Sequence, residues 1–435
     1  MTHTSTTLVL EKIVGGGQAI GTLPDGRKAF IWGGLPGETV EMTITKKKSK
    51  LVEGVVTNVI TPSTERITPI DPDSFLSTSP WQMMNFAAEQ RYKAQLIDEA
   101  FELHNVSLPD TTTVYTDNEI TKYRNKVEFS WYGTTNDDGT ESLDLAFFRR
   151  GSKGKIIVNQ CSLLPEPMMQ LALQVRDLLQ DQSISARQLK TLLIRCNQAG
   201  DCVFQLYVKD LTPDWKTILQ HIFNISGARP WKGGEVIYSD PRSPASRITE
   251  RLAQVGDIVL QDSILGTAFR YATEGFFQVN IPVYEQALLD MKHWIPENTA
   301  TIDMYSGVGT IGLTIGGPQC TLVEIDENAV REMRRNITDM KSTAQAVLAP
   351  SEKALEHITG KEIMIVDPPR AGLHADVIAR LLETRPSRII YLSCNPVTQA
   401  RDVALLLETY KITHHQGYNF FPRTPHIEHL VVLDV

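Results

Sequence analysis

The chain has 435 residues, more than one ordinary hydrophobic core holds, so two or three domains are expected. Its 42% hydrophobic and 22% charged residues are typical of a soluble globular protein, and no apolar run approaches the roughly 18 residues of a membrane span. The net charge of −8 argues against a general nucleic-acid coat, and five scattered cysteines argue against a disulfide framework. The first residues, MTHTSTTLVLEK, lack the features of a signal peptide, so we expect a cytoplasmic location with free thiols.

Residues 8–60 form a string of short apolar runs separated by turn signals such as GGG, PDG and GLPG. Frequent turns of this kind are typical of a small, OB-like β-barrel. The proline-rich stretch 60–74 that follows has the composition of a linker. The sequence therefore predicts a barrel domain over residues 1–62.

A second region combines one helix with several strands. Residues 82–104 have a helical pattern, whereas 120–210 contains runs that suit an antiparallel sheet. Two of these runs flank Asn197–Asp201, which is a hairpin signal. We therefore expect a linker helix and a central antiparallel β-sheet domain over residues 63–270.

Strand and helix signals alternate after about residue 280. Helices are predicted over 282–294, from 309, and over 327–340, 374–383 and 396–409, with an apolar strand before each of the last four. Such alternation indicates a parallel, doubly wound sheet. Two closing strands, near 411–421 and 427–435, are expected as antiparallel additions. The predicted fold class of residues 271–435 is therefore α/β and Rossmann-like.

A glycine-rich turn follows the first strand of this domain. Gly307, Gly309 and Gly312 form a G-x-G-x-x-G pattern that lets the backbone approach a ligand closely. Asp303 precedes the turn, and Glu324 ends the next strand, where a carboxylate can bind ribose hydroxyls. Two acids in these places suit S-adenosylmethionine better than a dinucleotide, which needs the helix N-terminus for phosphates. The alternative is that the glycines only allow helix and strand to pack closely.

Two further residues follow strands on the edge where open α/β sheets bind ligands. Asp367 begins the stiff Asp-Pro-Pro segment, although Pro-Pro also ends ordinary strands. Cys394 lies between a buried strand and a helix that Asn395 and Pro396 can start. Because a helix N-terminus stabilises a thiolate, we expect a lowered pKa and a nucleophilic Cys394.

A nucleophile beside a methyl donor suits methylation of carbon 5 of a pyrimidine. A thiolate that adds to carbon 6 makes carbon 5 nucleophilic, and a base must later remove the carbon 5 proton. Glu428 enters an otherwise apolar final strand, on the same face as His426 and Leu430. We expect Glu428 to be that base, and the alternative is a salt-bridged edge carboxylate.

Eight segments, in order, make the chain resemble the RNA 5-methyluridine methyltransferases over nearly its full length. They are YRNKVEFS (123–130), FFRRGSKGKIIVNQC (147–161), GFFQVN (275–280), DMYSGVGTIGL (303–313), VEID (323–326), VDPPRAG (366–372), LSCNP (392–396) and FPRTPHIE (421–428). The resemblance implies an N-terminal TRAM-like RNA-binding barrel, a central RNA-binding sheet and a class I methyltransferase domain. It also implies methylation of a uridine of tRNA or 23S rRNA. We expect a monomer and no membrane partner.

The resemblance also assigns roles to residues. It makes Cys394 the nucleophile and Glu428 the base. It implies S-adenosylmethionine contacts at Gln278, Tyr305, Gly307, Gly309, Thr310, Glu324 and Asp367, although relatives often carry Asn at the position of Thr310. A uridine in folded RNA must be swung out before catalysis, so basic side chains should grip the backbone. The residues that we expect to contact phosphates are Arg124, Lys126, Arg149 and Arg150.

Two departures from the family pattern matter. Some ribosomal-RNA relatives bind a [4Fe–4S] cluster, but residues 74–82 contain no cysteine and only Cys161 remains, so we expect no iron–sulfur cluster and no metal. The usual acid after the third strand is not evident in 347–353. Alternatives are a cytosine-5 enzyme, a non-catalytic RNA-binding or assembly factor, and more remotely a nicotinamide-dependent oxidoreductase. Arg370 stands where RNA cytosine-5 enzymes carry a cysteine, which favours uridine.

Overall fold

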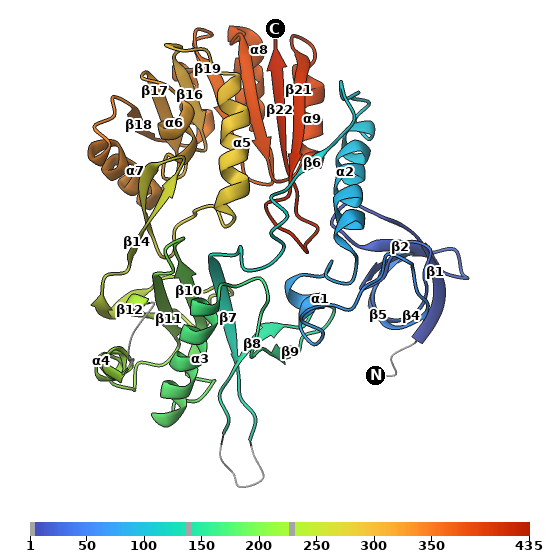
Figure 1. The fold of residues 1–435 in the computed structure, drawn as a ribbon, viewed down its shortest axis with the longest axis vertical. Coiled ribbons are helices and arrows are strands. Elements are labelled where there is room, and N and C mark those ends of the chain that lie inside the picture. Colours follow the sequence, from blue (N-terminus) through green and yellow to red (C-terminus); the bar gives the residue numbers. More distant parts are fainter. Residues whose placement is uncertain (1–4, 136–140, 226–230) are drawn as a thin grey trace.

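The computed structural model describes residues 5–135, 141–225 and 231–435. Figure 1 shows the C-terminal α/β domain above, with the barrel and the central sheet side by side below it. The three regions match the predicted fold class: a barrel, a mainly antiparallel central sheet and a Rossmann-like domain. No helix among the described residues is both long and apolar enough to cross a membrane.

The N-terminal strands close into a barrel in the order β1-β2-β3-β5-β4. Their bounds are β1 Ser5–Ile13, β2 Ala19–Thr22, β3 Lys28–Trp32, β4 Thr39–Lys47 and β5 Leu51–Thr61. Alternate residues such as Ala29 and Ile31 fill the barrel, so Phe30 and Trp32 lie on its outer surface, half-buried. Buried Glu38 accepts from Arg66 Nε at 2.6 Å, which ties the barrel to the following segment.

The central region is a seven-stranded sheet in the order β13-β12-β11-β10-β7-β8-β9. Its elements are β7 Lys126–Tyr132, β8 Asp144–Phe148, β9 Lys155–Ile157, α3 Glu166–Asp181, β10 Leu189–Cys196, β11 Cys202–Val208, α4 Trp215–Ile225, β12 Trp231–Tyr238 and β13 Glu250–Gly256. The predicted hairpin at Asn197–Asp201 is confirmed, because β10 and β11 pair directly across it. No helix was predicted between the strands of 120–210, whereas α3 buries Met168, Leu171 and Val175 on the sheet at helical spacing.

A helix and a two-stranded ribbon connect the lower domains with the C-terminal domain. After the short α1 (Phe75–Thr78), α2 (Phe86–Glu102) packs against α9 of the C-terminal domain, within the predicted 82–104. The ribbon of β14 (Val259–Ile264) and β15 (Thr267–Ala272) reaches α7 of the same domain. The C-terminal domain therefore contacts one segment that precedes the central sheet in the sequence and one that follows it.

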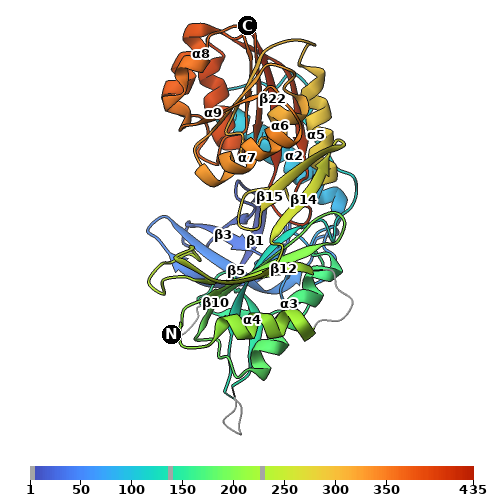
Figure 2. The same cartoon turned by 90° about the vertical axis from the view of Figure 1, so that its left-hand side faces the viewer.

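The C-terminal sheet has the order β18-β17-β16-β19-β20-β22-β21-β6. Its elements are β6 Val114–Tyr115, α5 Ile281–His293, β16 Thr301–Met304, α6 Thr310–Ile315, β17 Cys320–Glu324, α7 Glu327–Asp339, β18 Gln345–Leu348, η1 Ser351–Lys353, η2 Leu355–His357, β19 Ile363–Val366, α8 Ala375–Thr384, β20 Arg388–Ser393, α9 Pro396–Leu406, β21 Lys411–Tyr418 and β22 Glu428–Asp434. As predicted, the closing pair is antiparallel, because β22 runs opposite to both β20 and β21. Helices α2, α8 and α9 pack on one face and α5 and α6 on the other (Figure 2).

Candidate active site

A cavity of about 910 Å³ lies where the parallel strands of the C-terminal sheet end. Its walls come from the turns after β16, β17, β18, β19 and β20, from the start of β22 and from segment 272–278. Eight of the predicted site residues line it: Arg124, Gln278, Tyr305, Gly307, Glu324, Asp367, Cys394 and Glu428. The other five, Lys126, Arg149, Arg150, Gly309 and Thr310, do not.

The glycine turn, residues 307–312, joins β16 to α6 in a compact conformation. Gly309 caps α6 with φ of 91°, in the left-handed region that favours glycine. Gly312 donates its backbone N–H to Asp303 Oδ2 at 2.8 Å. A Cβ at Gly312 would lie 2.2 Å from Leu322 Cδ2, so close packing of α6 requires glycine there. The packing alternative and the ligand prediction are thus compatible.

Asp303 is completely buried, and its Oδ1 has no hydrogen-bond partner among the described residues. Burial raises its pKa to about 8, and Asp367 and Glu324 add to the shift. An unpartnered buried carboxylate oxygen is costly in an apolar environment. A positively charged group bound nearby would relieve this cost.

The edge formed by β17 and β18 supplies oxygens and one aromatic ring. Glu324 accepts the N–H of Gly307 on Oε2 at 2.9 Å and two further backbone N–H groups on Oε1. Tyr305, with φ of 66°, donates to Ser351 Oγ at 2.9 Å. Ser351 and Glu352 both line the cavity after β18, so an acid is present here that the sequence did not make evident. The only indication of this acid in the sequence was the position of Glu352, four residues after the end of β18.

The loop after β19 is joined to the start of α9. Asn395 Nδ2 and Thr398 Oγ1 donate to the carbonyl of Arg370 at 2.9 and 3.1 Å. Buried Asp402 accepts the N–H of Leu373 at 2.8 Å. These bonds hold the Asp-Pro-Pro-Arg segment against the turn that carries Cys394.

Strand register brings the predicted nucleophile and base together. Ser393, the last residue of β20, pairs with His429 of β22. One further step along the same antiparallel register puts Cys394 opposite Glu428. Both residues line the cavity, and Glu428 is 5% exposed.

The expected low pKa of Cys394 is wrong for the ligand-free protein. Desolvation raises the pKa of Cys394 to about 11, and the carboxylates of Glu428 and Asp367 add to the shift, whereas Arg370 opposes it. The helix N-terminus is present, since Pro396 starts α9, but its effect is outweighed. Burial raises the pKa of both Glu428 and Asp367, and the charge of Asp367 raises the pKa of Glu428 further.

Among the other polar side chains that line the cavity are two from loops, an arginine and a histidine, that were not among the predicted site residues. Arg370 and His426 line it, and Arg370 Nη2 lies 3.1 Å from His426 Nδ1. Exposed Phe276 also lines it, two residues before Gln278. Residues of these types are common in loops, so the sequence did not indicate a role for them. Only their position in the wall of the cavity identifies them as candidate site residues.

The predicted RNA contacts fall into two places. Arg124 lines the cavity, and neighbouring Lys126 Nζ lies 3.6 Å from Glu128 Oε1. Arg150 instead stacks on Trp32 of the barrel at 4.1 Å and donates to the carbonyl of Leu76 at 2.7 Å. Arg149 beside it is exposed.

The segment where some relatives bind a cluster has a polar network. Asp71 accepts from Ser162 Oγ at 2.6 Å and from Gln82 Nε2 at 2.9 Å, directly beside buried Cys161. Among the described residues, no group of three or more His, Cys, Asp or Glu side chains is placed to hold a metal ion. The absence of a cluster stays a prediction.

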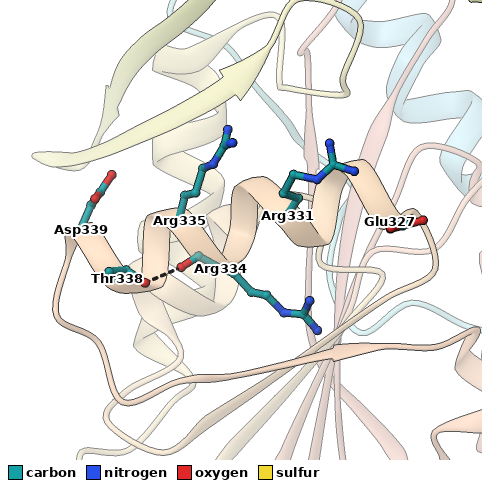
Figure 3. A pocket seen from close by; sticks show the side chains of 6 residues that line it. All are labelled: Glu327, Arg331, Arg334, Arg335, Thr338 and Asp339. Carbon is teal, nitrogen blue, oxygen red and sulfur yellow. Dashed lines mark hydrogen bonds between the residues drawn. The ribbon is translucent and has the colours of Figure 1, made fainter.

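A second, more open hollow of about 380 Å³ follows the exposed face of α7 (Figure 3). Its lining side chains are Glu327, Arg331, Arg334, Arg335, Thr338 and Asp339. Figure 3 shows Arg331 and Arg335 extending to one side of the helix and Arg334 to the other. This hollow contains no nucleophile and no pair of carboxylates near a thiol, so the larger cavity is the candidate active site.

The sheet order and the reversed β22 define the C-terminal region as a class I methyltransferase domain. Comparison with known proteins agrees. Residues 351–435 match the family model described as tRNA (Uracil-5-)-methyltransferase. Over this C-terminal segment the chain is therefore similar to the RNA uracil-5 methyltransferases.

Relatives and solved structures extend this similarity over the whole chain. An uncharacterized RNA methyltransferase of Enterococcus faecalis is 27% identical, with 93% of this chain and 92% of the relative covered. One of Nitratidesulfovibrio vulgaris is 26% identical, covering 98% and 95%. The crystal structure of Pyrococcus abyssi tRNA (uracil-54, C5)-methyltransferase in complex with S-adenosyl-L-homocysteine has a TM-score of 0.78 and 20% identity, covering 98% of this chain and all of that chain. The last similarity concerns the fold.

Proposed function

We propose that the protein transfers a methyl group from S-adenosylmethionine to carbon 5 of a uridine in structured RNA. One observation carries the proposal: the register of β20 and β22 brings Cys394 opposite Glu428 in a cavity that also contains the glycine turn and Glu324. A thiol and a carboxylate side by side supply the addition and elimination steps that carbon 5 methylation needs.

The cavity suits a positively charged methyl donor. Buried Asp303 keeps one oxygen without a partner, and Asp367 and Glu324 are near enough to raise its pKa. When bound, S-adenosylmethionine supplies an electrophilic methyl group on a sulfonium. Glu324 would accept hydrogen bonds from the ribose hydroxyls of the donor, and Tyr305 and Ser351 would lie beside its adenine. Gln278 would contact either the amino acid end of the donor or the target uracil.

The protein residues act in sequence on the pyrimidine. The Cys394 thiolate forms a bond to carbon 6, and the electron pair of the ring double bond moves toward carbon 5 and O4. After carbon 5 has received the methyl group, Glu428 takes the remaining proton from carbon 5. The ring double bond then reforms and the carbon–sulfur bond breaks, which returns the thiolate.

Raised pKa values suit this order of events. The sulfonium of bound S-adenosylmethionine would lower the raised pKa values of Cys394 and Glu428, so that Cys394 loses its proton to solvent as it adds to carbon 6 and Glu428 is a carboxylate when it takes the carbon 5 proton. We infer that the thiolate forms when donor and RNA are both bound, so that the free protein holds an unreactive thiol.

RNA would lie across the cavity mouth, the central sheet and the barrel. Arg124 lines the cavity, whereas Arg150 stacks on Trp32 of the barrel and Arg149 beside it is exposed. A Cβ at Gly151 would lie 2.3 Å from Val55 Cγ2 of β5, so this basic loop packs beside the strand pair that ends in the lysines of 46–50. Two basic clusters distant in sequence thereby form one surface for phosphates. We propose that the active unit is a monomer.

Trapping with 5-fluorouridine tests the chemistry. Carbon 5 of this base, once methylated, carries no proton for Glu428 to remove, so the enzyme should remain joined to the RNA in an SDS-stable adduct. Cys394→Ala should form no adduct and keep donor binding, whereas Glu428→Gln should accumulate adduct on ordinary RNA. A wild-type protein that binds RNA and donor but gives neither adduct nor 5-methyluridine would refute the proposal and favour an RNA-binding role. Mass spectrometry of digested tRNA and rRNA from cells lacking the gene would identify the uridine.

A further inference from the structure

His426 is a cavity-lining side chain that the proposed chemistry does not use. It is an exposed residue two positions before Glu428, just outside β22, and both side chains line the cavity. Its Nδ1 lies 3.1 Å from Arg370 Nη2, and its ring contacts the ring of Phe421 at 5.6 Å, edge to face. The imidazole is therefore held in orientation from two sides.

The partner of Nδ1 determines where the ring carries its proton. A guanidinium only donates hydrogen bonds, so Nδ1 must accept from Arg370. In a neutral imidazole the proton is then on Nε2. Desolvation and the positive charge of Arg370 lower the pKa of His426, so the ring is neutral at pH 7. Nε2 is thus a donor without a hydrogen-bond partner among the described residues.

Arg370 is itself fixed relative to the nucleophile. Its carbonyl accepts from Asn395 and Thr398, which begin the helix that follows Cys394. The turn that carries Cys394 therefore also holds Arg370, and Arg370 in turn orients the ring of His426. A base that presents carbon 6 to Cys394 and carbon 5 to Glu428 has its carbon 4 substituent next in the ring.

We propose that His426 Nε2 donates a hydrogen bond to O4 of the target uracil. The inference rests on the proposed function and adds the residue that selects the base. Addition of sulfur at carbon 6 moves negative charge onto O4, and a donor placed there stabilises that charge. Cytosine presents an amino group at carbon 4, which would meet the Nε2 proton with another donor. A site that donates at this position therefore accepts uracil and rejects cytosine.

The test uses the mapped target RNA with either uridine or 2-pyrimidinone riboside, which lacks O4, at the reacting position. His426→Ala should lower kcat/KM for the uridine RNA about 10²-fold, as loss of one oxyanion donor does elsewhere. On the 2-pyrimidinone RNA, wild type and His426→Ala should react at rates within about twofold of each other, because the lost contact has no partner there. His104→Ala, at the end of α2, is the control and should match wild type on both RNAs.

Two conservative variants separate a lost donor from a damaged fold. His426→Gln keeps an N–H at nearly the position of Nε2 and should retain more activity on uridine RNA than His426→Asn, whose amide ends at the position of Nδ1. Nitrogen-15 spectra of the imidazole should show the Nε2–H tautomer in wild type and a mixture in Arg370→Met.

Equal rate losses on the two RNAs, or no loss on uridine RNA, would overturn the proposal for His426. If the wild-type protein makes no 5-methyluridine at all, the proposed function itself fails. Titration calorimetry of each variant with S-adenosylmethionine shows that the cavity is intact, since His426 is assigned no donor contact.

Discussion

Removal of the Lys93 ammonium should destabilise the loop that leads to Glu428. Lys93 and Glu89 of α2 are both 0% exposed and lie 3.3 Å apart. Lys93 Nζ donates to Asn419 Oδ1 at 2.5 Å and to the carbonyl of Phe421 at 3.1 Å. Glu89 accepts the backbone N–H of Arg423, a residue with φ of 65°. The cluster thus fixes a strained turn five residues before the proposed base.

The magnitude follows from burial. Replacing one partner of a buried pair leaves the other charge without compensation, which typically costs about 3–5 kcal/mol. We expect Lys93→Met and Glu89→Gln each to lower the free energy of unfolding by about that amount. The double variant should be more stable than the sum of the two losses predicts, by about 2 kcal/mol, because the Lys93–Glu89 pair is then removed as a whole and only Arg423, whose Nη1 lies 3.7 Å from Glu89 Oε2, loses a partner. The exposed pair Lys12 and Glu99 is the control, and Lys12→Met should cost under about 1 kcal/mol.

Urea unfolding followed by fluorescence is the assay, since the ring of Trp81 lies 5.9 Å from Lys93 Nζ and reports on this region. pH gives a second measurement. Burial lowers the pKa of Lys93 to about 8, so between pH 8 and about 10.5 the unfolded chain binds more protons than the folded chain. Stability should therefore rise across this window by about 3 kcal/mol relative to Lys93→Met. Strictly additive single losses, or no difference in pH dependence, would refute the reasoning.

Three further outcomes are expected. Alkylation of Cys394 by iodoacetamide should become about tenfold faster per pH unit from pH 7 to 10, because the pKa of its thiol is raised to about 11. Bound S-adenosylmethionine should shift this rate profile to lower pH. A rate that does not change with pH would contradict the raised pKa. Gly312→Ala should destabilise the fold by about 1–3 kcal/mol in urea, since its Cβ would overlap Leu322, whereas Gly15→Ala, with open space, should not. Charge reversal at Arg149 and Arg150 should weaken RNA binding in filter assays but spare donor binding, and equal loss of both would count against that division.

Much of the fold could be predicted because local signals agreed with it. Alternating apolar runs and helix starts predicted most elements from α5 to β22 in order, with ends that differ by a few residues, although no range was given for the strand β18. Helix α3 was missed although Met168, Leu171, Val175 and Leu179 recur at helical spacing after Pro165. Its neighbours on both sides are strands, and no element was predicted for the segment between them. The pairing of β13 with β12, and the packing of α2 on α9, depend on contacts between distant segments, which no local pattern contains.

The candidate active site likewise has features that local sequence predicts and features that depend on distant residues. Glycine spacing, the acid that ends β17 and the Cys-Asn-Pro turn are local patterns, and eight predicted residues do line one cavity. The pKa of Cys394 is not a local property: the helix that follows it predicts a low pKa, but burial, together with Glu428 and Asp367 from other strand ends, raises the pKa. The same holds for His426, whose tautomer depends on an arginine 56 residues earlier in the chain. A residue type can therefore indicate which chemistry is possible, whereas its protonation, and hence its reactivity, follows from neighbours that only the folded chain assembles.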